Sequence, residues 1–371
     1  MRSLYLFQIL LAASCLVLAI NADPQAICRG LVLQGGSDKG AYQAGALKGL
    51  LDSIGGDEIG YDVISGVTIG GINAAWMSQF PKGLEEPMID ELTDFWLTVK
   101  SSDMYKNWEA GPIQGLLFES SLYNTAPQTQ YLKTHITQPP QRYVAIGAAN
   151  ANNGAFKVFH NFQQNFEVGN FLDVVQAANG IAAVFPYVNI GDSTYFDGSV
   201  LKSMDISSVV DQCRALTAGN DSAIVIDILM LSANKSFSEA DVSKYNSIQV
   251  LIRTLELMSY QDSMIGIIRA QQSYPNIKFR YVISPSKALP HGNLPFSYNH
   301  NDIEAMMAQG AQDAKNAVAK GPGVSFYEHV ELAYRKTNRG MANVGPLMNK
   351  YFQQVNDILS QRKEQQQVID M

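Results

Sequence analysis

The sequence predicts an α/β fold in which helices flank a mostly parallel central sheet. Two strand-turn-helix units indicate this class: an apolar run at residues 30–34 precedes a helical segment at 41–53, and an apolar run at 61–64 precedes one at 69–77. Short apolar runs bounded by turns are typical of buried parallel strands. Parallel neighbours need a crossover connection, which the helical segments supply.

Strands and helices continue to alternate along the chain. Further strands are predicted at residues 142–149, 155–159, 223–231 and 278–283. Further helices are predicted at residues 86–99, 170–183, 239–272 and 302–319. The break Gly321-Pro322-Gly323 ends this pattern, and residues 324–371 are expected to form one or two more helices. The predicted organisation is a signal segment at 1–22, one α/β domain at 23–320 and a C-terminal helical extension at 321–371.

The composition is that of an ordinary globular protein. Of the 371 residues, 46% are hydrophobic and 16% are charged, which allows a large buried core. The net charge of −7 argues against nucleic acid as a partner and against strong attraction to anionic lipid surfaces. The histidines and cysteines lack the spacing of a zinc site.

Residues 1–22 have the pattern of a secretory signal peptide. Arg2 supplies the positive start, residues 4–18 form a short apolar run, and small residues precede Asp23. An uncleaved N-terminal anchor is the alternative, although the run is short for a membrane span. Cleavage predicts a protein that is secreted or lies in the lumen of the secretory pathway or a lysosome.

Two further features suit an oxidising compartment. Cys28 and Cys213 are candidates for a disulfide, with two free buried thiols as the alternative. Asn220 and Asn234 each begin an Asn-X-Ser sequon and are candidates for glycosylation.

A sharp turn between strand and helix is predicted at Gly66-Val67-Thr68-Ile69-Gly70. This is the context of a nucleophile elbow, GxSxG, with threonine in the position of the serine. A threonine hydroxyl can attack a carbonyl carbon. The elbow backbone often has a positive φ, which costs a β-branched residue about 1–3 kcal/mol. The extra methyl also restricts χ1 and can fill space that an ester carbonyl needs.

A glycine-rich turn, Gly35-Gly36-Ser37-Asp38-Lys39-Gly40, follows the first predicted strand. It fits neither GxGxxG nor GxxxxGK[ST], so a nucleotide-binding loop is not indicated. Backbone N–H groups at the start of a helix can instead stabilise an oxyanion during acyl transfer. The alternative is a tight turn without chemistry. A third motif, Asp197-Gly198, offers a carboxylate that is either a catalytic base or a turn residue bonded to nearby N–H groups.

The three motifs together resemble those of the patatin-like phospholipase family, whose pattern is a GGGx[KR]G oxyanion loop, a GxSxG elbow and a DG[GA] aspartate motif. The resemblance covers roughly residues 28–320. It implies a three-layer α/β/α fold and a serine-aspartate dyad without histidine. This chain departs from the pattern once in each motif, at Ser37, Thr68 and Ser199.

The resemblance implies a role for each matching residue. Thr68 takes the place of the nucleophile, and Asp197 that of the base that accepts its proton. Lys39 fills the basic position of the first loop. The amides expected to hold the oxyanion are those of Gly35, Gly36, Ser37 and Asp38. A triad of Thr68, Asp197 and His291 is an alternative, although His291 lies in a loop rich in proline and glycine.

The expected function is hydrolysis of ester bonds in lipids or other esters by a secreted protein, with peripheral contact to a membrane. Such hydrolysis requires no metal and no organic cofactor. The exchange of serine for threonine leaves a second hypothesis open, a catalytically impaired member that binds lipid. A storage-like secreted glycoprotein is a third. Large aromatic residues are expected mostly in the core, with a minority lining a site for an apolar ligand: Trp96, Tyr105, Trp108, Phe118 and Tyr123.

Overall fold

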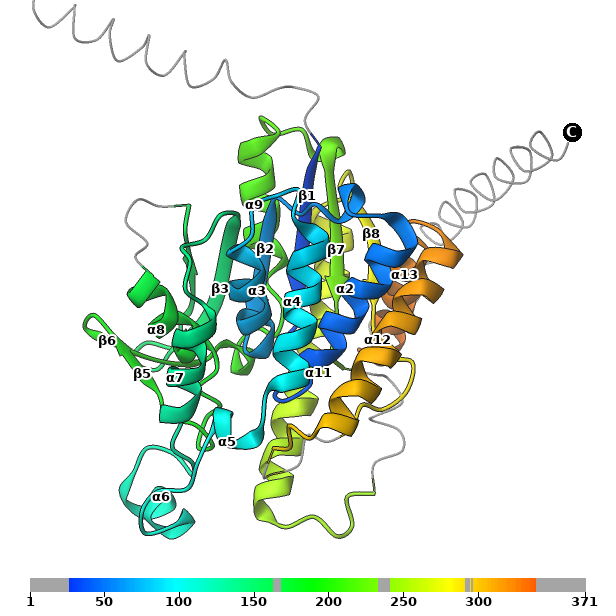
Figure 1. Ribbon diagram of the computed structural model, residues 1–371. Helices are drawn as coiled ribbons and strands as arrows, with labels where there is room; N and C mark the ends of the chain where they lie inside the picture. Colours follow the sequence, from blue (N-terminus) through cyan, green and yellow to red (C-terminus); the bar gives the residue numbers. More distant parts are fainter. Residues whose placement is uncertain (1–26, 163–167, 233–240, 291–293, 295, 338–371) are drawn as a thin grey trace, which may run out of the picture.

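The computed structural model describes residues 27–162, 168–232, 241–290, 294 and 296–337. Within them an eight-stranded sheet passes through the molecule, and helices cover both of its faces (Figure 1). This arrangement confirms the predicted three-layer α/β/α fold class with a mostly parallel sheet.

The sheet has a parallel centre and an antiparallel side. Its strands are β1 (Cys28–Leu33), β2 (Val63–Val67), β3 (Tyr143–Asn150), β4 (Phe156–His160), β5 (Val188–Ile190), β6 (Ser193–Asp197), β7 (Ile224–Leu229) and β8 (Lys278–Ile283). They are hydrogen-bonded in the order β5-β6-β3-β2-β1-β7-β8, and β4 also pairs with β3. The neighbours from β3 to β8 are parallel, whereas β4, β5 and β6 pair in antiparallel fashion.

The described helices fall into two layers and a set of short connections. The layers contain α2 (Gly40–Ile54), α3 (Ile69–Ser78), α4 (Glu85–Thr98), α8 (Val168–Ala178), α9 (Ile206–Leu216), α11 (Ser247–Ser273), α12 (His300–Lys320) and α13 (Val324–Lys336). The connection from α4 to β3 carries α5 (Ser101–Met104), α6 (Pro112–Phe118) and α7 (Ala126–His135).

Two apolar cores, one on each face of the sheet, hold the layers together. β1 contributes Leu31 and Leu33 to the first core and Val32 to the second, because successive strand residues point to opposite faces. The first core includes side chains of α2, α3, α4 and α12, and the second those of α9, α11 and α13. The inner strands are therefore apolar on both faces, as the sequence pattern indicated.

The C-terminal segment is helical where it is described. α13 contributes Phe326, Val330 and Ala333 to the second core, so its 13 residues pack on the sheet together with the rest of the fold. The remainder of the predicted extension, residues 338–371, lies outside the described residues.

Two helices are shorter than the sequence pattern predicted. α11 begins at Ser247 instead of residue 239, because Asn246 and Gln249 each accept a hydrogen bond from the other's backbone N–H, at 3.0 and 2.9 Å. α8 ends at Ala178 instead of residue 183, where the N–H groups of Asn179 and Gly180 turn back to carbonyls three residues earlier.

Candidate active site

Thr68 stands at the tip of the turn between β2 and α3. Its backbone has φ 47° and ψ −125°, a region that a β-branched residue occupies at a cost of about 1–3 kcal/mol. The flanking glycines are required by close packing. A Cβ added to Gly66 would lie 2.2 Å from the carbonyl oxygen of Gly70, and one added to Gly70 would lie 2.5 Å from that of Leu33. The turn is therefore a strained elbow.

The strand pairing brings Asp197 to the same place. β4 lies along one edge of β3 over residues 145–149, so β2 and β6 share the other edge. They run in opposite directions along it, and Val67 and Asp197, their last residues, lie opposite adjacent residues of β3. The two strand ends therefore meet, and Thr68, which follows Val67, comes beside Asp197.

The Asp197 carboxylate is buried and held by one neighbour. The Ser199 backbone N–H donates to Oδ1 at 2.9 Å, and the Ser199 hydroxyl donates to Oδ2 at 2.7 Å. Burial raises the pKa of Asp197 to about 6, although the hydrogen bonds from Ser199 and the nearby Thr68 hydroxyl act in the opposite direction. A carboxyl group with this pKa changes its charge close to neutral pH.

The Thr68 side chain faces the glycine-rich loop with its methyl group. A Cβ added to Gly35 would lie 2.1 Å from Cγ2 of Thr68, so this methyl fills the space beside Gly35. The hydroxyl is buried and has no regular hydrogen bond within the described residues, although it is close enough to Asp197 to lower the pKa of that carboxyl. The hydroxyl therefore lies near the Asp197 carboxylate without a regular hydrogen bond to it.

The glycine-rich loop offers fewer amides than the sequence predicted. The Gly35 N–H donates to the Ser203 carbonyl at 3.0 Å and is therefore not available to an oxyanion. The N–H groups of Gly36 and Ser37 have no such backbone acceptor in the described part of the chain. Ser37 has φ 55°, which explains why glycine suits its position in the motif. Asp38 is buried, and one of its oxygens accepts a hydrogen bond from the Ser297 N–H at 3.4 Å.

A cavity of about 200 Å³ opens beside these groups. Gly36, Asp197 and Ser199 line it together with residues from the first half of α11. Thr68 does not line it, because only 2% of the residue is exposed. The cavity therefore reaches Asp197 and the glycine-rich loop, while an ester would reach Thr68 only by displacing the groups around it.

A half-buried ion pair joins the loop to the cavity wall. Lys39 Nζ lies 2.9 Å from Glu256 Oε1, and Arg253 contacts the other oxygen of Glu256 at 3.2 Å. Burial lowers the pKa of Lys39, but the carboxylates of Glu256 and Asp38 outweigh it and leave the pKa above its ordinary value. No sequence motif pointed to α11 as a wall of the site, because Arg253 and Glu256 are too far from the loop in the chain.

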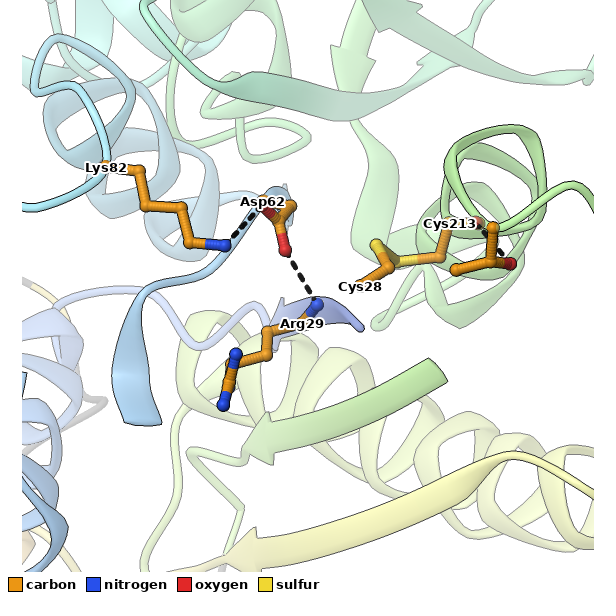
Figure 2. The surroundings of a disulfide bond; sticks show 6 residues. Cys28, Arg29, Asp62, Lys82 and Cys213 are labelled. Carbon is orange, nitrogen blue, oxygen red and sulfur yellow. Dashed lines mark hydrogen bonds and ion pairs between the residues drawn. A yellow bond between two sulfur atoms is a disulfide. The ribbon is translucent and has the colours of Figure 1, made fainter. Parts of the chain in front are cut away.

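The candidate disulfide is present in the structure. Cys28 at the start of β1 and Cys213 in α9 are joined, with their Cα atoms 5.5 Å apart (Figure 2). It fastens the first strand to the second helical layer. Beside it, the Arg29 N–H donates to Asp62 at 2.9 Å, and Asp62 also pairs with Lys82 at 2.6 Å.

The remaining predicted residues divide between the described and undescribed parts of the chain. Asn220 is exposed and caps a short 3₁₀ turn. Asn234, His291 and the signal segment 1–22 lie outside the described residues, so the glycosylation of Asn234 and the triad alternative stay predictions. Of the aromatic residues, Trp96 is buried and donates to Asn73 at 2.9 Å, whereas Phe118 is exposed.

Metal ligation and membrane spans can be judged for the described residues only. In them no group of three or more His, Cys, Asp or Glu side chains is arranged to hold a metal ion. No helix in these ranges is both long and apolar enough to cross a membrane.

The elbow, the adjoining loop and the buried carboxylate lie together on an α/β/α fold. Residues 31–210 match the family described as patatin-like phospholipase. Among solved structures, the crystal structure of VipD from Legionella pneumophila is similar, with 10% identity, a TM-score of 0.39, and coverage of 90% of this chain and 80% of that chain. No curated protein matches the chain. The match to this family supports lipid acyl hydrolysis as the class of activity.

Proposed function

We propose that this protein is a secreted lipid acyl hydrolase that uses Thr68 as nucleophile and Asp197 as base. The observation that carries the proposal is the meeting of the elbow and the buried carboxylate at the facing ends of β2 and β6. The amides of Gly36 and Ser37, which have no backbone acceptor within the described residues, adjoin the carboxylate in the same cavity. These are the three groups that acyl transfer requires.

The proposed reaction has two halves. Thr68 Oγ1 forms a bond to the ester carbonyl carbon while Asp197 accepts the hydroxyl proton, and the amides of Gly36 and Ser37 bind the oxyanion. The tetrahedral intermediate then expels the alcohol, which takes the proton from Asp197 and leaves an acylated Thr68. Water attacks this ester with Asp197 again as base, which releases the fatty acid and restores the hydroxyl.

Hydrolysis by the wild-type protein tests the proposal most simply. We expect measurable release of fatty acid from phosphatidylcholine and of p-nitrophenol from short-chain esters, and loss of both in Thr68→Ala, because the nucleophile is then missing. Thr217→Ala is the matched control, since Thr217 is a buried threonine at the end of α9, far from Asp197 in the fold. Equal rates for the wild type and Thr68→Ala would contradict the proposal.

The pH dependence of the reaction follows from Asp197. The carboxyl must be ionised to accept a proton, and burial raises its pKa to about 6. We therefore expect kcat/KM to rise about tenfold per pH unit below pH 6 and to level off above it. A profile recorded between pH 4 and 8 checks this. An acid limb near the ordinary aspartate pKa of about 4 would show that another group is the base.

A lipid-binding protein without catalysis is the second candidate. The position of the Thr68 methyl against Gly35 and the burial of its hydroxyl favour it. In that case phospholipid would bind with the same affinity to the wild type and to Thr68→Ala, and neither would turn it over.

Secretion and domain organisation are further parts of the proposal. The disulfide between Cys28 and Cys213 suits an oxidising compartment, as do the predicted signal segment and the sequons at Asn220 and Asn234. We propose cleavage before Asp23 and a destination outside the cell or in a lysosomal lumen. A single α/β domain with a helical C-terminal segment and peripheral contact with a membrane complete the proposal.

A further inference from the structure

Among the described residues, two helices carry most of the large apolar side chains that are exposed to solvent. In α6, four side chains keep between 65% and 81% of their surface exposed: Ile113, Leu116, Leu117 and Phe118. In α11, five are between 41% and 50% exposed: Ile248, Val250, Leu251, Leu257 and Met258. Single exposed apolar residues are common on proteins, whereas such groups mark interaction surfaces. We call these nine residues the apolar rim.

Both parts of the rim lie at the end of the molecule where the candidate site is found. The parallel strands run toward the elbow and the glycine-rich loop, and α6 and the start of α11 extend beyond that same end (Figure 1). The opposite end carries the turn before α4, because α3 leads back from the elbow along the sheet.

α6 is fastened to a segment that lines the cavity. After α6, the N–H of Leu122 donates to the Ala183 carbonyl at 2.9 Å, and that of Tyr123 donates to the Val184 carbonyl at 3.0 Å. Ile181 and Ala182, directly before these acceptors, line the cavity. The exposed side chains of α6 therefore have a fixed place near the cavity.

α11 presents apolar side chains both to the cavity and to solvent, although Arg253, Glu256 and Ser259 also line the cavity. Ile252 and Leu255 line the cavity, while Leu251 and Met258 of the same helix are exposed. The ion pair of Glu256 with Lys39 fixes this half of the helix to the glycine-rich loop. Apolar side chains of α11 are thus present both at the cavity wall and on the outside of the molecule.

The charged residues around the apolar rim indicate which kind of lipid surface it suits. α6 contains no charged residue, and Glu109 and Glu119 stand before and after it. In the first half of α11, Arg253 and Glu256 pair with each other, and the whole chain carries a net charge of −7. Such a surface gains from apolar burial but not from attraction to anionic lipid.

We propose that the apolar rim inserts into the surface of a phospholipid bilayer without net charge, such as one of phosphatidylcholine, and places the opening of the cavity against that surface. This deepens the proposed function, since it rests on a lipid substrate, but it does not require Thr68 to be an active nucleophile. A short helix with four protruding apolar side chains and no charge can enter the interface without burying an unpaired charge. The lipid molecule would then reach the cavity along the apolar side of α11.

Sedimentation with phosphatidylcholine vesicles tests the proposal. The protein begins at Asp23, so that the apolar run at residues 4–18 is absent, and carries Asp197→Asn, so that the lipid stays intact. We expect binding that falls at least about tenfold in Leu117→Glu/Phe118→Glu and in Val250→Glu/Leu251→Glu, because each pair loses two inserting side chains. The matched control is Leu84→Glu, an exposed leucine at the opposite end of the sheet, which should bind as the parent does.

A second measurement does not depend on adding charge. The emission of Phe118→Trp should shift to shorter wavelength by more than that of the parent, which has three tryptophans of its own, when phosphatidylcholine vesicles are added, and the shift of Leu84→Trp should not exceed that of the parent. Four results would overturn the proposal: no vesicle binding by the parent, binding unaffected by both glutamate pairs, binding that requires phosphatidylglycerol and is lost in salt, or a dimer that the glutamate pairs dissociate. If the wild type bound vesicles but hydrolysed no ester, the proposed enzymatic function would be contradicted, whereas the proposed docking surface would be supported.

Discussion

Thr68→Ser is expected to raise kcat/KM for ester substrates by about 10- to 100-fold, because a displacement of about 1 Å in a reacting group costs on the order of a hundredfold. The substitution removes the methyl that packs against Gly35 and leaves the hydroxyl in place. It also lets χ1 rotate, so that the hydroxyl can turn toward Asp197. Initial rates with p-nitrophenyl butyrate and with phosphatidylcholine check this.

The matched control for this change is Thr217→Ser. Thr217 is buried and donates to the Cys213 carbonyl at 3.0 Å. Thr217→Ser therefore removes a buried methyl group outside the candidate site and reports the effect of lost packing alone. An activity of Thr68→Ser equal to or below that of the wild type would mean that the methyl does not limit the reaction, and the reading of the elbow would be wrong.

Asp197→Asn is expected to lower kcat by about 10²- to 10⁴-fold while stabilising the protein, because it removes both the base and a buried charge. Burial raises the pKa of this carboxyl from 3.8 to about 6, so the native state binds the proton more tightly than the unfolded chain. Protonation of Asp197 therefore stabilises the native state. This stabilisation is fully present below pH 3.8 and is lost as the pH rises through 6. At pH 7 the ionised group costs about 1–3 kcal/mol, which asparagine avoids.

The two effects are measured separately. Thermal unfolding should give a higher Tm for Asp197→Asn than for the wild type at pH 7, and the difference should shrink toward pH 4. The control is Asp313→Asn, which changes a buried carboxylate that accepts hydrogen bonds from Tyr42 and Ser286, both at 3.0 Å, and should not stabilise. A lower Tm for Asp197→Asn than for the wild type at pH 7 would contradict the claim that the buried Asp197 carboxylate destabilises the native state.

Much of the fold could be predicted from local patterns. Residues 278–283 form β8 within the predicted bounds, and the strand-turn-helix units around Gly35 and Thr68 have the predicted order, because buried parallel strands are continuous apolar runs. The start of α11 was missed by several residues, since its apolar pattern begins before the cap at Asn246 that sets it. The short helices between α4 and β3 have too few turns to show a period.

The site could be predicted only in its parts. Glycines at 66 and 70 and the strained Thr68 are local features that a motif reveals. The contact of Thr68 with Asp197 depends on β6 running against β2 along the same edge of β3, which no short pattern encodes. The hydrogen bond from Gly35 to Ser203 likewise joins segments far apart in the chain, so the loss of that amide from the oxyanion loop appears only in three dimensions.

The most direct test of Thr68 as the nucleophile is covalent labelling by a fluorophosphonate, followed by mass spectrometry of the digested protein. The account predicts a phosphonyl adduct on Thr68 in the wild type, faster labelling of the same position in Thr68→Ser, and no adduct there in Thr68→Ala. An adduct on another residue, such as Ser199 in the cavity wall, or labelling of the wild type and Thr68→Ala at equal rates, would contradict it.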